Sequence, residues 1–244
     1  MNKRTKKRSI ISTVVIAVAI VLGIIAAPTA GAATVTAAGA SAATAAASCT
    51  VKAALPARIA ITKHYTETPV RLVGCAAAEY GSTNITGPEG LLDVMIWNFG
   101  VGDVDYLAFY DWEKTGTYRT SSGMAWIWGG DDIPWVNSST VIKYGSSVSL
   151  TVKRTPGIST LSIGVKGWNP DYNIWGGWKP WTGKAVSIYS APSAKGPWKR
   201  VAGGRTNSLG KATAKLRTGA QRYWQVRTTD GGTTFGANSA VRKG

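Results

Sequence analysis

Short apolar runs that alternate with polar residues fill this chain from Cys49 onward, and no stretch keeps the 3.6-residue period of a helix. The runs are rich in Val, Ile, Thr, Tyr and Trp, and Gly, Pro, Asn and Asp separate them, which is the pattern of strands joined by turns. In the first part of the chain the predicted strands are residues 94–99, 106–110, 117–119, 125–128 and 141–144. The chain is therefore predicted to be all-β.

The alternation is clearest in the second part of the chain, where about seven short runs are found, the count of an immunoglobulin-like or fibronectin-III-like β-sandwich. Each run can turn one apolar face inward, because side chains of a strand point alternately to its two faces. The predicted core consists of Leu161, Ile163, Val186, Ile188, Leu216, Trp224 and Val226.

Charge divides the folded part of the chain into two segments. Residues 49–150 carry seven Lys and Arg against ten Asp and Glu, a net charge of −3, whereas residues 151–244 carry sixteen against two, a net charge of +14. This asymmetry predicts two β-sandwich-like units, residues 49–146 and residues 147–244, of which the second is immunoglobulin-like and strongly basic.

The N-terminus has the pattern of an export signal. Five basic residues lie between Lys3 and Arg8, an apolar stretch follows over residues 10–27, and Ala30-Gly31-Ala32 fits a signal peptidase site. Cleavage after Ala32 is expected, giving a secreted protein that is extracellular or associated with the cell wall and has no stable membrane span. An uncleaved membrane anchor is the alternative. Residues 33–48 are almost entirely Ala, Thr, Ser and Gly and are expected to form a disordered spacer, because they cannot bury enough surface to offset the ordering of their backbone.

Two cysteines, Cys49 and Cys75, lie near the start of the predicted folded part. In an exported chain the expectation is a disulfide between them, because thiols then meet an oxidising environment. A pair of free thiols and a lipid-modified Cys49 are the alternatives.

A dense group of cations lies in the second unit, with no acidic residue among them: Lys199, Arg200, Arg205, Lys211, Lys215, Arg217, Arg222 and Arg227. Strand alternation places Lys211, Lys215 and Arg217 on the outside of one strand and Arg227 on the outside of another. These strands belong to opposite sheets of an immunoglobulin-like sandwich, so the cations are expected to cover two faces and to form no single groove. The expected partner is an anionic wall polymer or polysaccharide, bound through charge, and no specific nucleic acid.

Aromatic residues gather between two predicted strands: Trp168, Tyr172, Trp175, Trp178 and Trp181. They either form an exposed platform that stacks on sugar rings or serve as the private core of a long connection. The other predicted structural tryptophans, which lie in or beside strands, are Trp97, Trp112, Trp126, Trp128 and Trp135.

No catalytic residue, metal site or cofactor is predicted. His64 is the only histidine, which excludes sites with several His ligands, and it is expected to be an exposed strand or turn residue. The clustered acidic residues are expected in solvated loops. Calcium binding by Asp103, Asp105, Asp131 and Asp132 and a catalytic pair drawn from Asp93, Asp103, Asp105, Asp111 and Glu113 remain alternatives.

Several segments carry a resemblance to a known group: "YDWEKTGTYR", "VIKYGSSVSLTVKR", "WGGWKPWTGKAVSIYS", "GPWKRVAGGRTNSLGKATAKL" and "RYWQVRTTDG". Over roughly residues 105–242 the chain resembles secreted actinobacterial proteins of unassigned function whose C-terminal unit is similar to immunoglobulin-like repeats. The resemblance implies a secreted module and no particular reaction.

Together these observations predict a monomeric, non-enzymatic binding or interaction module at or near the cell envelope. A cationic secreted toxin or inhibitor is the main alternative. A carbohydrate-active enzyme that uses Asp and Glu residues of the first unit is the other.

Overall fold

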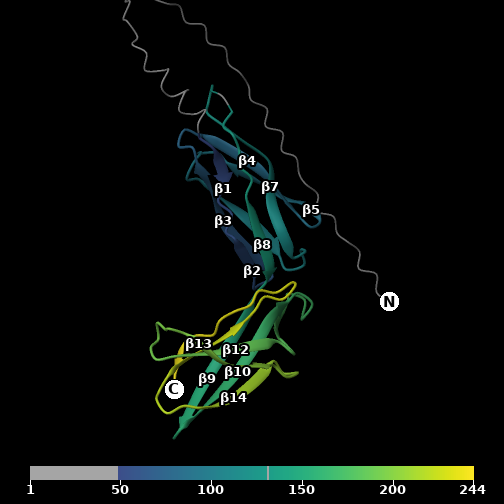
Figure 1. Ribbon diagram of the computed structural model, residues 1–244. Coiled ribbons are helices and arrows are strands. Elements are labelled where there is room, and N and C mark those ends of the chain that lie inside the picture. Colours follow the sequence, from purple (N-terminus) through teal and green to yellow (C-terminus); the bar gives the residue numbers. More distant parts are fainter. Residues whose placement is uncertain (1–48, 131) are drawn as a thin grey trace, which may run out of the picture. The chain divides into compact units, whose positions relative to one another are not determined.

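The computed structural model describes residues 49–130 and 132–244, and every regular element in them is a strand (Figure 1). The predicted export signal (residues 1–32) and spacer (residues 33–48) lie outside the described residues. Within the described part no helix is long and apolar enough to cross a membrane. The all-β prediction is confirmed.

Strands β1 to β8 form two sheets that we call the first sandwich. The smaller sheet has the order β1-β3-β6 and the larger one the order β2-β8-β7-β4-β5. The bounds in the smaller sheet are β1 Val51–Ala53, β3 Tyr65–Gly74 and β6 Val104–Tyr110. Those in the larger sheet are β2 Arg58–Ile61, β4 Tyr80–Gly87, β5 Gly90–Trp97, β7 Gly116–Trp126 and β8 Ser139–Tyr144.

The strand order of the first sandwich is immunoglobulin-like. Its first strand is divided between the sheets, because β1 pairs antiparallel with β3 while β2 pairs parallel with β8. The remaining strands β3, β4, β6, β7 and β8 then take the places of strands B, C, E, F and G. The Tyr118 hydroxyl donates a 2.6 Å hydrogen bond to the Lys114 carbonyl at the start of β7, which is the tyrosine corner found at the same place in many such domains.

Side chains of both sheets share the core of the first sandwich. Trp97 is fully buried on β5, and its indole N–H donates to the Val70 carbonyl of the facing sheet. The other large buried side chains of this core include Ile61, Leu72, Ile85, Met95, Leu107, Phe109 and Ile142. Most of the strands that precede Val94 were not predicted, since β1 and β2 are only three and four residues long and β3 and β4 are rich in Thr, Gly and polar residues.

The predicted disulfide between Cys49 and Cys75 is confirmed, with the two Cα atoms 5.2 Å apart. It joins the residue before β1 to the residue after β3, and these strands are neighbours in one sheet, where Val51 pairs with Gly74. The bond therefore lies within a sheet and differs from the inter-sheet disulfide of antibody domains.

Strands β9 to β16 form the second sandwich. One sheet contains β10 (Ile158–Asn169), with β9 (Ser146–Thr155) on one edge and β14 (Lys211–Arg217) and β11 (Gly177–Pro180) on the other. The second sheet has the order β13-β12-β15-β16. Its bounds are β12 Ala185–Ala191, β13 Lys199–Arg205, β15 Tyr223–Thr228 and β16 Arg242–Lys243. With β9, β10 and β14 as A, B and E, and β12, β15 and β16 as C, F and G, the predicted immunoglobulin-like order is confirmed.

The predicted core of the second sandwich is also confirmed. Leu161 and Ile163 of β10, Val186 and Ile188 of β12, and Trp224 and Val226 of β15 are buried, and Leu216 packs against them while half-buried. Strand β10 alternates strictly between inward Leu161, Ile163 and Val165 and outward polar residues, so one strand supplies both the core and an outer surface.

Two details add to the prediction. The aromatic connection is in part a hairpin, because β10 continues to Asn169 and pairs Trp168 with Trp178 on β11. Strand β13 is exposed along nearly its whole length, so Val201 belongs to the surface. The division into domains at residues 146 and 147 stays a prediction; β8 ends at Tyr144 and β9 begins at Ser146.

We expect Leu161→Ala to lower the free energy of unfolding by about 2 to 5 kcal/mol, because it empties space in a fully buried site. Ile158→Ala on the same strand is the matched control, since Ile158 is exposed. Urea unfolding of both variants measures the difference, and equal midpoints would refute the core assignment.

Cleaving the Cys49–Cys75 bond should also destabilise the protein. The cysteines are 26 residues apart, so loss of the cross-link is expected to cost about 3.5 kcal/mol through the entropy of the unfolded chain. Thermal unfolding of the Cys49→Ser/Cys75→Ser variant checks this, and thiol labelling of the denatured, unreduced wild type should find no free thiol.

Candidate functional site

The outer surface of β9, β10 and β14 is a continuous basic surface, which we call the basic face. Strand pairing places Lys215 and Lys153 on either side of Thr160. Lys211, Lys166 and Arg217 point outward from the same sheet and are exposed. The predicted outward position of Lys211, Lys215 and Arg217 is confirmed, and the structure adds Lys153 and Lys166, which the sequence analysis left out.

Hydroxyl groups fill the basic face between the cations. Thr213, Ser162 and Thr151 form one row across the three strands. These side chains are short, so they project little from the sheet, and they supply hydrogen-bond donors and acceptors beside the ammonium groups. The acidic residues of residues 147–244 are Asp171, in the β10–β11 connection, and Asp230, which pairs with Arg58 at 2.9 Å. No carboxylate in the described chain forms an ion pair with a cation of the basic face.

The sheet on the other side of the second sandwich carries a different basic surface. Arg227 lies over the Tyr189 ring, with its guanidinium carbon 4.3 Å from the ring centroid, and its Nε donates to Gln225. Arg200 pairs with Tyr189 across the neighbouring strand. Arg205 lies further along β13 and donates to the Gly183 carbonyl. Six of the eight predicted cations therefore lie on the two faces, and Lys199 and Arg222 lie at one end of the sandwich.

The predicted aromatic group divides between the core and the surface. Trp181 packs against the second core and carries the Lys184 ammonium 4.1 Å from its ring centroid; burial lowers the pKa of Lys184. Trp168 and Trp178 are half-buried and meet edge to face. Trp175 and Tyr172 are 61% and 54% exposed. Core tryptophans and exposed aromatic residues therefore occur in one segment, and sugar stacking by the exposed residues stays a prediction.

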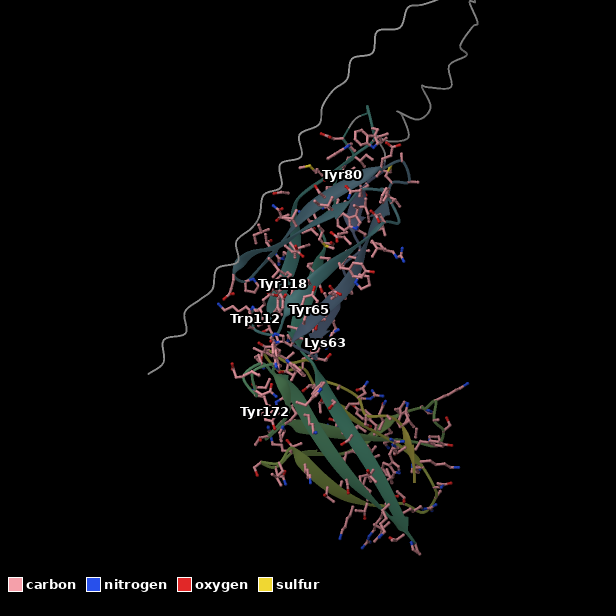
Figure 2. All side chains as sticks on the ribbon, turned by 180° about the vertical axis from the view of Figure 1, so that it is seen from behind. Lys63, Tyr65, Tyr80, Trp112, Tyr118 and Tyr172 are labelled. Carbon is pink, nitrogen blue, oxygen red and sulfur yellow. A yellow bond between two sulfur atoms is a disulfide. The ribbon has the colours of Figure 1, made fainter. Side chains whose placement is uncertain are left out.

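The exposed aromatic residues continue around His64. The ring of His64 meets Trp175 and Trp112 edge to face at centroid distances of 4.8 and 5.0 Å, and Trp112 stacks on Tyr110 at 4.3 Å. Figure 2 shows Trp112 and Tyr65 at the same end of the first sandwich. The prediction that Trp112 and Trp128 are structural is wrong, because they are 62% and 78% exposed.

A buried carboxylate organises this cluster. Asp111 is 2% exposed and accepts hydrogen bonds at its two oxygens, from His64 Nδ1 at 3.0 Å and from Trp168 Nε1 at 3.3 Å. A side chain at Gly176, whose φ is +71°, would overlap the Asp111 carboxylate. The predictions of an exposed His64 and a solvated Asp111 are therefore wrong, since each is the other's partner.

Two residues of the remaining acidic cluster, Asp103 and Asp105, accept hydrogen bonds at the open edges of the first sandwich. Asp105 accepts from the backbone N–H groups of Ile96 and Tyr106 at 2.8 Å, and Asp103 accepts from those of Phe99 and Val104. Strands β5 and β6 end their sheets, so these carboxylates satisfy N–H groups that no strand pairs. No three His, Cys, Asp or Glu residues of the described chain are placed to hold a metal ion, and Asp131 lies outside that part.

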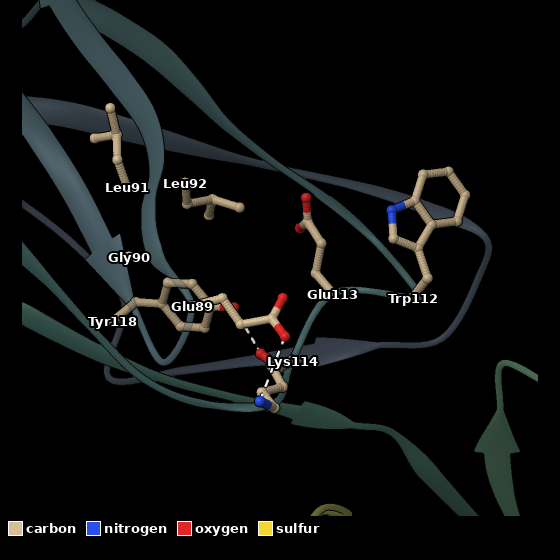
Figure 3. A pocket seen from close by; sticks show the side chains of 8 residues that line it. All are labelled: Glu89, Gly90, Leu91, Leu92, Trp112, Glu113, Lys114 and Tyr118. Carbon is tan, nitrogen blue, oxygen red and sulfur yellow. Dashed lines mark hydrogen bonds and ion pairs between the residues drawn. The ribbon is translucent and has the colours of Figure 1, made fainter. Parts of the chain in front are cut away.

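A pocket of about 350 Å³ contains two carboxylates, Glu89 and Glu113, beside Trp112 (Figure 3). Glu89 lies 3.4 Å from the Lys114 ammonium, and Glu113 accepts from the Tyr110 backbone N–H. Burial is the main cause that raises the pKa of Glu113, and the charges of Asp93 and Glu89 add to it. Burial likewise raises the pKa of Asp93, helped by Asp105. Of the five carboxylates named for the enzyme alternative, Glu113 lines this pocket.

Comparisons with known proteins give little that bears on function. No family model matches the chain, and no curated protein sequence matches it. Among solved structures, the fibronectin(III)-like modules of CbhA from Clostridium thermocellum are 10% identical, with 79% of this chain and 90% of that chain covered and a TM-score of 0.32. The chicken interferon gamma receptor alpha chain is 12% identical over 72% of this chain and 90% of its own, with a TM-score of 0.34. The D0-D1 domain of intimin is 13% identical over 79% and 96%, with a TM-score of 0.25. Likenesses this weak carry no argument, so the fold assignment rests on the strand order of this chain.

Replacing Asp111 should test whether it organises the aromatic cluster. Asp111→Ala leaves the Trp168 indole N–H and His64 without an acceptor, and we expect a loss of about 1 to 3 kcal/mol in the free energy of unfolding. Asp171→Ala removes an exposed carboxylate and is the matched control. Unfolding of both variants in urea measures the effect, and an unchanged midpoint for Asp111→Ala would contradict the assignment.

Proposed function

We propose that the chain is a secreted, non-enzymatic interaction protein that binds anionic polymers of the cell envelope through its basic face. The observation that carries this proposal is the alignment of five cations on one sheet surface without a paired carboxylate: Lys153, Lys166, Lys211, Lys215 and Arg217.

The spacing of these cations suits a repeating ligand. Neighbouring strands lie about 4.8 Å apart, so Lys153 and Lys215, which are separated by β10, are about 10 Å apart at their backbones. Lys211 and Lys215 are four residues apart on one strand, which is about 13 Å. A polymer with a charge in each repeat can meet several of these cations together, whereas a small anion can meet one.

The shape of the basic face supports recognition of charge, and it does not suit recognition of a nucleotide sequence. Reading of base edges needs an element that enters a groove, and a sheet surface of short hydroxyl side chains offers none. The disulfide supports an oxidising, extracellular location. The secretory leader, the cell-wall location and the monomeric state are parts of the same proposal.

A second candidate function rests on the aromatic cluster around His64. Trp112 and Trp175 are exposed, and indole rings stack on neutral sugars. Binding of this kind would depend little on salt, so salt separates the two candidates.

The salt dependence of retention tests the proposal. On a column of polyglycerol phosphate at low salt the protein should be retained, and the logarithm of its affinity should fall by roughly 0.7 per neutralised charge for each tenfold rise in salt. The variant Lys153→Glu/Lys211→Glu/Lys215→Glu should elute early. A matched control, Lys52→Glu/Lys63→Glu/Lys195→Glu, makes the same change in net charge at exposed positions outside the basic face and should be retained far better.

Two results would overturn the proposal. Equal loss of retention in both triple variants would mean that total charge alone matters. Retention that persists at about 1 M salt, where the Debye length is near 3 Å, and that disappears in Trp112→Ala/Trp175→Ala would favour sugar stacking.

A further inference from the structure

A pocket of about 400 Å³ opens at the end of the second sandwich where β12 and β14 finish and β13 and β15 begin. Its polar lining is formed by Lys199, Arg217, Arg222 and Trp224, with Ser190 and Thr218 beside them. Lys199 comes from one sheet and Arg217 from the other, so this pocket brings together cations of both sheets.

The charge of the pocket is unbalanced. In the described part of the chain, no ion pair involves Lys199, Arg217 or Arg222. Asp230 is engaged by Arg58, and Asp171 follows the far end of β10, away from the pocket. Three cations line the pocket without an Asp or Glu side chain paired to them, so they repel one another, and a bound anion would relieve this repulsion.

Two residues of the lining carry a hydrogen-bond donor that lacks an acceptor. The Nε of Arg222 and the indole Nε1 of Trp224 are buried and have no partner in the structure, and Trp224 as a whole is 1% exposed. Buried N–H groups are rarely left unpaired, so each such group calls for an explanation. These donors belong to the residues that also supply the charge or the wall of the pocket, and an oxyanion is an acceptor that could pair with them.

The kind of anion follows from the donors and the space. A phosphate group offers three acceptor oxygens, and the guanidinium fork matches it in a bidentate manner. A volume of about 400 Å³ lies within the range of small-molecule sites and exceeds the needs of a bare ion. Val201 and Leu216 add apolar wall that could cover the carbons of a glycerol or sugar unit.

We propose that this pocket binds the phosphate group of a glycerol- or sugar-phosphate unit. The assignment of that unit to an envelope polymer rests on the proposed function. The basic face would then attract the polymer as a whole, and the pocket would hold one of its phosphate groups, as either a terminal monoester or a diester within the chain.

Titration of the full chain with glycerol 3-phosphate, followed by nuclear magnetic resonance, tests the proposal. The indole N–H signal of Trp224, assigned by its absence in Trp224→Phe, should shift on binding, and glycerol alone should leave it in place. Arg222→Gln should weaken binding at least tenfold. Arg200→Gln, on the exposed strand β13, is the matched control and should change affinity less than twofold. Glycerophosphoglycerol in place of glycerol 3-phosphate distinguishes a diester from a terminal monoester.

Several outcomes would overturn the proposal: an unmoved Trp224 signal, equal affinity of Arg222→Gln and wild type, or binding of glycerate as tight as that of glycerol 3-phosphate. If Arg222→Gln fails to fold, Lys199→Gln, at an exposed position, takes its place. The two proposals fail separately. Arg222→Gln should still be retained on polyglycerol phosphate at low salt through the basic face, whereas wild type that binds glycerol 3-phosphate but passes through that column would refute only the proposed function.

Discussion

The hydrogen-bonded ladder of β10 is the constraint on which the second sandwich depends. β10 is paired on both edges, and its side chains alternate between Leu161, Ile163 and Val165 inside and Thr160, Ser162 and Gly164 outside. A slip of one residue in this register would exchange the two sets and move hydroxyl groups into the core. The same register sets Lys153 and Lys215 beside Thr160. The core and the basic face are therefore two results of one pairing pattern, and the free energy that fixes the core also fixes the spacing of the cations.

Charge has a different role in each sandwich. In the first sandwich, the carboxylates of Asp103 and Asp105 accept hydrogen bonds from backbone N–H groups at the open edges of two sheets. The Asp111 carboxylate accepts hydrogen bonds from His64 and Trp168. These negative charges are engaged within the fold, where they also make the edges less able to pair with another chain. In the second sandwich the cations of the basic face have no carboxylate partner in the described chain. These cations are therefore available to act on a partner outside the molecule.

The core residues of the second sandwich and the outward position of Lys211, Lys215 and Arg217 could be predicted from the sequence. Both follow from the alternation of side chains between the two faces of a strand, which repeats every two residues. Contacts between distant strands could not be predicted in this way. Asp111 is buried because His64, 47 residues earlier, and Trp168, 57 residues later, supply its donors. Trp112 looked structural beside a strand, yet it lies at a turn and points outward. The pocket of Lys199, Arg217 and Arg222 combines three strand ends, and no local spacing indicates that they meet.

The basic face and the pocket differ in how they can discriminate between ligands. Exposed charges act over about one Debye length, roughly 8 Å at physiological salt, and accept any polyanion of suitable charge density. Buried donors act at contact distance, where an analogue without the matching acceptor leaves them unpaired and loses affinity. Orphan donors on Arg222 and Trp224 can therefore supply a selectivity that the basic face lacks. Because Arg217 contributes both to the basic face and to the pocket lining, a polymer held on the face would have its charged groups next to the pocket mouth, which raises the local concentration of the group that the pocket is proposed to bind.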